Sequence, residues 1–201
     1  MKSKRTNNSR YDQKEVYVSV DIEASGPIPA EYSMLSLGAC LVHNTAKTFY
    51  VELKPINTNY VKEALEVCGL SMEYLMQHGT EPDIAMKQFD QWVRTIEGRP
   101  VFVGFNTPFD WSFVNYYFYK YVGNNPFGHN ALDIKAYWMG LRKTKWYQTA
   151  KQRIPAYLKS KLKHNHNALQ DSIEQADLFT NLLSVRKYLR HIRSKAKRKG
   201  A

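Results

Sequence analysis

The order of predicted strands and helices constrains the fold of this 201-residue chain more than any other feature. Three strand-like segments come first and predict an antiparallel meander: 16–20 with an end near Glu23, 34–42, and 48–53. Two short apolar segments, 100–105 and 131–133, follow and alternate with helical patterns, as buried parallel strands do. We therefore predict an α/β fold of three layers, in which helices cover a mixed five-stranded sheet.

Helical patterns account for most of the remaining apolar segments. Helices are predicted at 61–75 with a break at Gly69, at 81–96, at 109–121, around Tyr137 and Trp138, and from 168 past 189. In the helix at 109–121, Phe113, Tyr117 and Tyr121 recur every four residues, so we expect them in the core. The stretch 143–163 has no clear pattern.

Length and composition predict a single domain at 15–190, between a basic disordered arm at 1–14 and a basic tail at 191–201. No apolar run approaches the roughly 18 residues of a membrane span, and the polar first residues do not resemble a signal peptide. We therefore expect no membrane partner. Cys40 and Cys68 lie among apolar neighbours and predict buried free thiols, which suit a reducing compartment, the cytoplasm.

The net charge of +11 is unevenly distributed. Residues 134–170 contain nine Lys or Arg and no acid, and residues 184–201 contain eight and no acid. With the basic arm also set aside, the rest of the chain is acidic. This distribution predicts cations bound inside the domain and a polyanion bound along one side, although the termini also fit solubilising tails.

Two carboxylates stand at the end of the first predicted strand. Asp21 and Glu23 are two residues apart, so both side chains point to the same face of the sheet. Carboxylates close to a core need a compensating charge, and Mg²⁺ prefers hard oxygen ligands of this kind. Taken alone, the pair is weak evidence for a metal site, because a solvated strand end explains it better.

Two further patches carry the remaining chemistry, and each acid has a structural alternative. Asp110 follows Asn106 closely at the start of a helix, where an acid favours the helix dipole and an asparagine favours a turn. Asp171 begins a capping-box pattern. His166 precedes Asp171 by five residues, and a histidine beside a carboxylate is the usual general base near neutral pH.

In this order, the three patches resemble the three exonuclease motifs of the DnaQ-like DEDDh 3′–5′ exonucleases, over roughly residues 16–185. The resemblance implies an RNase H-like fold and two Mg²⁺ or Mn²⁺ ions. It implies that the metal ligands, which are also catalytic residues, are Asp21, Glu23, Asp110 and Asp171, and that His166 is the catalytic general base. The tyrosine type of the family is excluded, because Asn167 stands where its tyrosine would be.

The resemblance also implies where substrate is bound. In the family, the loop after the acidic pair contacts the 3′-terminal nucleotide. Here that loop is Ala24, Ser25 and Gly26, where many members carry Thr before Gly, so we expect backbone contacts only. Asn106 and Phe109, beside Asp110, complete the predicted substrate contacts, with Phe109 as a base-stacking residue or a wall of the site.

The basic stretch from Lys135 to Lys163 contains five interleaved aromatic residues: Tyr137, Trp138, Trp146, Tyr147 and Tyr157. Cations that follow phosphates and rings that stack on bases predict a groove for a single strand. The alternative is that the rings pack in the core and the cations form a solvated face.

Together these features predict a metal-dependent 3′–5′ exonuclease that releases nucleoside 5′-monophosphates from single-stranded nucleic acid with a free 3′ end. RNA is slightly favoured over DNA, although no motif reveals contacts to the 2′-OH. Two alternatives stay open: an RNase H-like endonuclease, and a nucleic-acid-binding protein with a degenerate site. Related stand-alone exonucleases are often dimers, so a homodimer also stays open.

Overall fold

The structure is a computed structural model that describes residues 14–162 and 165–199, with side chains as far as Arg186. Its sheet has the strand order β3-β2-β1-β4-β5. The strands are β1 (Glu15–Ala24), β2 (Met34–Leu41), β3 (Asn44–Glu52), β4 (Arg99–Gly104) and β5 (Ala131–Asp133). The first three are antiparallel neighbours, whereas β4 and β5 run parallel to β1. The predicted mixed five-stranded sheet is confirmed.

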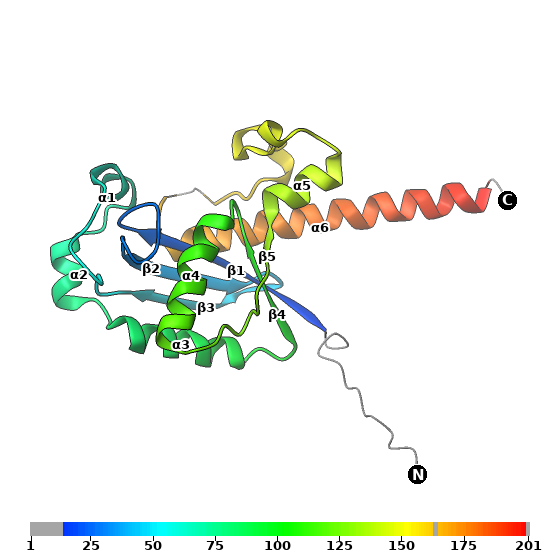
Figure 1. Cartoon of the computed structure of the whole chain (residues 1–201). Coiled ribbons are helices and arrows are strands. Elements are labelled where there is room, and N and C mark those ends of the chain that lie inside the picture. Colours follow the sequence, from blue (N-terminus) through cyan, green and yellow to red (C-terminus); the bar gives the residue numbers. More distant parts are fainter. Residues whose placement is uncertain (1–13, 163–164, 200–201) are drawn as a thin grey trace, which may run out of the picture.

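Helices cover both faces of this sheet (Figure 1), which gives the predicted three layers. The helices are α1 (Lys62–Cys68), α2 (Met72–His78), α3 (Pro82–Arg94), α4 (Pro108–Tyr121), α5 (Ile134–Arg142) and α6 (Ala168–Lys199). Gly69, with a φ of 67°, ends α1 at the predicted break. The stretch without a clear pattern folds into three 3₁₀ turns: η1 (Trp146–Thr149), η2 (Lys151–Arg153) and η3 (Ala156–Leu158).

Side chains along β1 alternate between the two faces of the sheet, and each face has its own core. The β1 residues Val18, Val20 and Ile22 pack against α3 and α4, together with the fully buried Phe113 and Tyr117. This confirms the two helix aromatics as core, and the half-buried Tyr121 packs against the same cluster. The opposite face packs against α5 and α6 in a second core. The odd-numbered residues at the end of β1, Asp21 and Glu23, are left at the edge of that second face.

The predictions for the arm, the tail and the thiols have different outcomes. Residues 1–13 of the predicted arm lie outside the described residues, as do the side chains of the tail. Cys40 is a buried free thiol, as predicted, and burial raises its pKa to about 12. Cys68 is also free but only half-buried, because α1 lies at the surface and has no fully buried residue. Among the described residues, no helix is long and apolar enough to cross a membrane.

The first turn of α6 lies directly on β2, at Gly38. A Cβ atom at this position would lie 2.2 Å from the carbonyl carbon of Ala168 and from the nitrogen of Leu169. Asn167 caps this helix, since its Oδ1 accepts a hydrogen bond from the Gln170 N–H at 3.1 Å. The capping-box alternative for Asp171 is therefore wrong, because Asp171 lies inside the first turn of α6 and not at its cap.

We expect Gly38→Ala to lower the free energy of unfolding by roughly 1 to 3 kcal/mol, because the added methyl group forces α6 away from the sheet. Activity should fall by more than the loss of folded protein explains, because α6 carries Asp171. Thermal melts and activity assays check both effects. Gly140→Ala is the matched control: it lies in α5 with open space around it, and should be neutral or stabilising by roughly 0.5 to 1 kcal/mol.

Candidate active site

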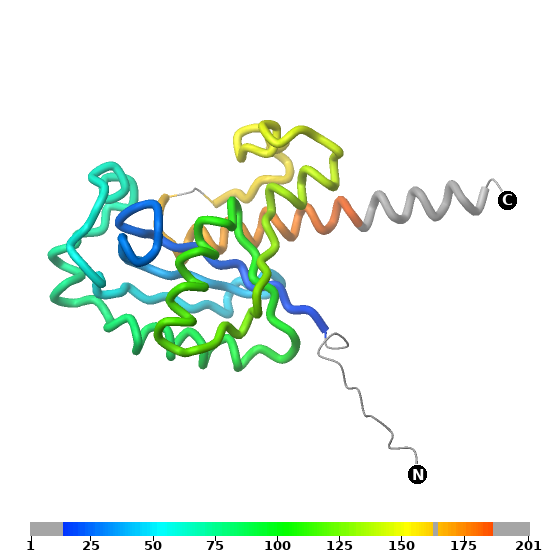
Figure 2. Tube along the Cα trace, in the orientation of Figure 1, coloured from blue at the N-terminus to red at the C-terminus, as the bar shows by residue number. Residues whose placement is uncertain are grey.

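The three predicted patches meet at one end of the sheet. Because β1 and β4 are parallel neighbours, the end of β1 and the loop after β4 lie at the same edge, and the first turn of α6 covers them (Figure 2). This is the edge where open α/β sheets commonly bind ligands. The fold therefore brings together segments that are more than 80 residues apart in sequence.

Three side chains form a compact group at this edge. One ligand atom each from Glu23, His166 and Asp171 lies within 4.8 Å of the others. Asp171 is fully buried in the first turn of α6, and its Oδ1 accepts a hydrogen bond from the Asn165 N–H at 3.2 Å. Two carboxylates and an imidazole at this spacing can hold a divalent cation.

Asp110 approaches from the opposite side of β1. It lies in the first turn of α4, is almost fully buried, and accepts a hydrogen bond from the Ile22 N–H at 3.1 Å. Ile22 stands between Asp21 and Glu23, so this bond places the Asp110 carboxylate beside both. The helix-dipole alternative is compatible with this position, but it does not explain why a carboxylate is buried against a strand.

Burial and mutual repulsion give the cluster an unusual protonation equilibrium. The pKa of Asp21 is raised well above its ordinary value by burial and by the charges of Asp110, Glu23 and Asp171. Burial, Asp171 and Asp110 raise the pKa of Glu23 to about 8, and burial raises that of Asp110 to about 7. Acids that repel one another in this way fit a site for divalent cations, because bound cations would relieve the repulsion.

His166 has a backbone conformation that is uncommon for a non-glycine residue. Its φ is 55°, in the left-handed region, and it lies just before the helix cap Asn167. The side chain is half-buried and reaches Glu23 and Asp171 from this turn. A strained residue at a cluster of acids is typical of a functional site.

Gln175 is a residue of the site that the sequence analysis missed. It is only 2% exposed, its Oε1 accepts a hydrogen bond from the Phe105 N–H at 2.8 Å, and its Nε2 donates to Asp21 Oδ1. It therefore ties the loop after β4 to the end of β1. Its position four residues after Asp171, on the same side of the predicted helix, was the signal that could have identified it.

The three predicted substrate-contact residues in the loop after the acidic pair, Ala24 to Gly26, are all buried. Ser25 is fully buried, and its hydroxyl donates to the Asn59 carbonyl at 2.8 Å and accepts from the Ser33 N–H at 2.9 Å. Its backbone N–H and carbonyl also have partners, in Ser33 and Val61. Ser25 thus holds the loop together, while Ala24 is buried before it and the ring of Tyr32 lies against Gly26.

The other two predicted contacts lie on the loop after β4. Phe109 is 36% exposed, and its ring centroid lies 5.3 Å from that of Phe113, so a part of the ring is left on the surface beside Asp110. Asn106 has a φ of 66° and accepts a hydrogen bond from Lys135 Nζ at 3.1 Å. Asp133, on β5, serves a structural role, since it caps α5 through the Ala136 N–H and accepts the Thr107 N–H.

The five aromatic residues of the basic stretch divide between the two readings. Trp138 is in the core and the half-buried Tyr137 packs against Phe179, as the structural alternative expected. Trp146, Tyr147 and Tyr157 are exposed, as a substrate groove requires. The two packed rings lie in α5, whereas the three exposed rings lie in 3₁₀ turns that are too short to show a period in the sequence.

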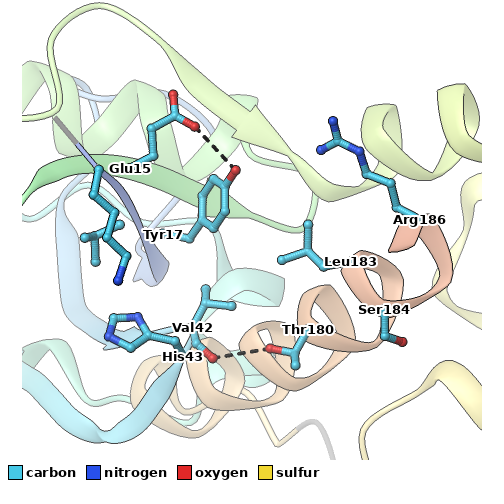
Figure 3. Close-up of a pocket in the computed structure, with 10 residues that line it drawn as sticks. Glu15, Tyr17, Val42, His43, Thr180, Leu183, Ser184 and Arg186 are labelled. Carbon is cyan, nitrogen blue, oxygen red and sulfur yellow. Dashed lines mark hydrogen bonds between the residues drawn. The ribbon is translucent and has the colours of Figure 1, made fainter. Parts of the chain in front are cut away.

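A separate cavity lies at the other end of the sheet (Figure 3). It has a volume of about 520 Å³ and lies between the start of β1, the turn after β2 and the middle of α6. Its lining includes Tyr17, Val42 and Leu183, with Arg186 and Glu15 at its rim. None of the five predicted catalytic residues lines it, so this cavity is not the candidate active site.

Comparison with known proteins settles the family. A family model described as Exonuclease matches residues 18–179. The chain belongs to this exonuclease family. A relative from Escherichia coli, named 3′-5′ DNA exonuclease Cap18, is 47% identical over 169 residues, which cover 83% of this chain and 90% of the relative. The expectation that this protein is an exonuclease is confirmed.

Solved structures support the fold. The nuclease domain of 3′hExo, a DEDDh family member bound to rAMP, has a TM-score of 0.67 and 15% identity, over 84% of this chain and 92% of that chain. Cell-death related nuclease 4 also has a TM-score of 0.67 and 14% identity, and the match covers 85% of this chain and 64% of that chain. E. coli Exonuclease I in complex with a dA16 oligonucleotide has a TM-score of 0.62 and 14% identity, and the match covers 86% of this chain and 41% of that chain. The RNase H-like fold and the resemblance to the DEDDh exonucleases are confirmed.

The raised pKa values predict how stability depends on pH when no metal is bound. The folded protein keeps the protons of Glu23 and Asp110 to pH values of about 8 and 7, whereas the unfolded chain releases them near 4.5 and 3.8. The folded state therefore binds more protons between these limits, and its free energy of unfolding should fall as pH rises through them.

Asp110→Asn should remove part of this fall, because asparagine does not titrate and its Oδ1 can still accept the Ile22 N–H. Thermal melts in EDTA from about pH 5 to about pH 8 measure the difference between the variant and the wild type. At the upper end of this pH range, saturating Mg²⁺ in place of EDTA should restore the stability that the wild type has lost. Parallel curves for the two proteins, unaffected by Mg²⁺, would contradict this account of the cluster.

Gln175→Leu tests whether this residue positions Asp21. Because the variant loses the bonds to Asp21 and to the Phe105 N–H, we expect roughly 10- to 100-fold weaker metal activation, as for other residues that orient a ligand. The measurement is the Mg²⁺ concentration that gives half-maximal activity. Gln170→Leu, at an exposed position of the same helix, is the control and should leave that concentration unchanged.

Proposed function

We propose that this protein removes nucleotides one at a time from the 3′ end of single-stranded DNA. The observation that carries the proposal is the meeting of Glu23, His166 and Asp171 within 4.8 Å, beside Asp21 and Asp110. The same residues and order define the motifs that the sequence shares with the DEDDh exonucleases. An acidic cluster of this kind would repel nucleic acid unless bound cations neutralised it.

The choice of DNA depends on the relative at 47% identity, whose name specifies DNA. The sequence alone slightly favoured RNA, and structural neighbours include one bound to rAMP and one bound to a DNA oligonucleotide. At 14 to 15% identity these neighbours support the fold, and they do not indicate whether the substrate of this chain is DNA or RNA. DNA is therefore the proposed substrate, and RNA is the comparison in the experiment.

Asp21, Glu23, Asp110 and Asp171 would hold two divalent cations, Mg²⁺ or Mn²⁺. Such ions polarise a phosphoryl oxygen, lower the pKa of a bound water and stabilise a departing oxygen. The residues around the ligands fix their orientation: the Ile22 N–H holds Asp110, and Gln175 holds Asp21. Orientation by buried hydrogen bonds keeps the carboxylates in place before substrate binds.

His166 would act as the general base that accepts a proton from the attacking water. The turn at Asn165–Asn167 holds the imidazole at the edge of the cluster, within reach of Glu23 and Asp171 and at the surface. A half-buried imidazole can take up a proton from the site and return it to solvent. Phe109, with part of its ring exposed next to Asp110, would face the terminal base.

The deciding experiment follows 5′-labelled single strands of DNA and of RNA with time. We expect stepwise shortening from the 3′ end in Mg²⁺, nucleoside 5′-monophosphate as the product, and no activity in EDTA. Asp110→Asn and His166→Ala should each lower the rate by at least roughly 100-fold while the melting curve stays cooperative.

The open alternatives give different results in the same assay. An endonuclease would cut a circular single strand, which has no 3′ end. A binding protein with a degenerate site would retain DNA in Mg²⁺ without shortening it. Activity that persists in EDTA would overturn the metal-dependent assignment.

A further inference from the structure

The segment after β5 contains a group of exposed rings and cations that the catalytic cluster does not use. Trp146 and Tyr147 are 52% and 58% exposed. The surrounding stretch, residues 134–170, contains nine Lys or Arg and no acid. Exposed rings among cations are what a single-stranded polyanion with stacking bases requires.

A series of side-chain contacts connects this segment to the catalytic cluster. Lys135 Nζ lies 4.5 Å from the centroid of the Trp146 ring and 3.1 Å from Asn106 Oδ1. Asn106 directly follows Phe105, whose N–H is bound by Gln175, and Gln175 in turn binds Asp21. Trp146 is therefore separated from a catalytic carboxylate by only a few contacting side chains.

The segment continues into a hollow of about 440 Å³, whose lining includes Arg142, Arg153, Thr144 and Gln148. The Arg153 guanidinium lies 5.2 Å from the Tyr147 ring centroid, and that of Arg142 lies 5.6 Å from the Trp138 ring centroid. No acid lines this hollow, and neither arginine pairs with a carboxylate among the described side chains. Two guanidiniums at such a hollow suit backbone phosphates.

One nearby cation is excluded from this role. Lys151 forms an ion pair with the buried Glu174 of α6, and its Nζ also lies 5.4 Å from the Phe105 ring centroid. Its charge is therefore compensated within the protein, and it holds η2 against the helix that carries Asp171. By contrast, Lys135, Arg142 and Arg153 lie beside the rings or line the hollow, and none of them forms an ion pair with a carboxylate among the described side chains.

We propose that Lys135, Arg142, Trp146, Tyr147 and Arg153 form a basic ledge that binds the DNA strand on the 5′ side of the bond being cut. The rings would stack on bases, and the guanidiniums would bind phosphates. This inference rests on the proposed function. When the 3′-terminal nucleotide lies at the acidic cluster, the strand can continue only toward its 5′ end, and the ledge is the basic surface that begins beside that cluster.

The test compares kcat/KM for a dinucleotide and for a single strand of about 16 nucleotides. Trp146→Ala and the double variant Arg142→Ala/Arg153→Ala should each lose about tenfold on the long strand and less than about twofold on the dinucleotide, which cannot span the ledge. For the double variant, the slope of log kcat/KM against log salt should also become less steep by about 1.4, because two phosphate contacts on a single strand are lost. Tyr119→Ala and Lys87→Ala, on α4 and α3, are the matched controls.

The outcomes separate the ledge from the proposed function. If the wild type shortens no single strand of DNA, the proposed function is wrong. If the wild type shortens DNA and the ledge variants match the controls on the long strand, the ledge is wrong. An equal loss on both substrates would also overturn it, because that result places the damage at the catalytic cluster. Melting curves of each variant verify that it is folded.

Discussion

The close approach of α6 to β2 is the contact on which the rest of the site depends. It requires Gly38, because any side chain there would collide with the backbone of Ala168 and Leu169. Once α6 lies against the sheet, its first turns place Asp171 and Gln175 beside the end of β1. One helix thus supplies an acid of the cluster and the amide that orients another acid, while the turn just before it supplies the histidine.

The same arrangement costs stability in the absence of metal. Four carboxylates share a partly buried edge, and the pKa values of three of them are raised by burial, with mutual repulsion adding to the effect at Asp21 and Glu23. A hydrophobic cluster of the same size would stabilise the fold, whereas this one stores electrostatic repulsion that a bound cation can relieve. The extensive cores on both faces of the sheet offset that cost. The cluster is therefore best understood through its chemistry, since its contribution to folding is unfavourable.

Much of the fold could be predicted from the sequence, because each strand and most helices have a local periodic pattern. The predicted strand segments and the helix break at Gly69 match the structure closely. The stretch 143–163 could not be predicted, since its 3₁₀ turns are too short to show a period and are held by tertiary contacts such as Lys151 with Glu174. Trp138 lies in α5 and is buried in the core, whereas Trp146 lies in η1 and is exposed, although both belong to the same basic stretch of sequence.

The sequence by itself determined the family and the residues of the candidate site: the acids, the histidine and the five-residue step between His166 and Asp171. Motif spacing is local and so is readable along the chain. Only the tertiary structure decided that Gln175 bridges Phe105 and Asp21, that Asn167 rather than Asp171 caps α6, and that the hydrogen-bonding groups of Ser25 are engaged by Ser33 and by the segment 59–61. These are contacts between distant segments or choices among competing local partners, and they are settled by how α6, β1 and β4 pack together.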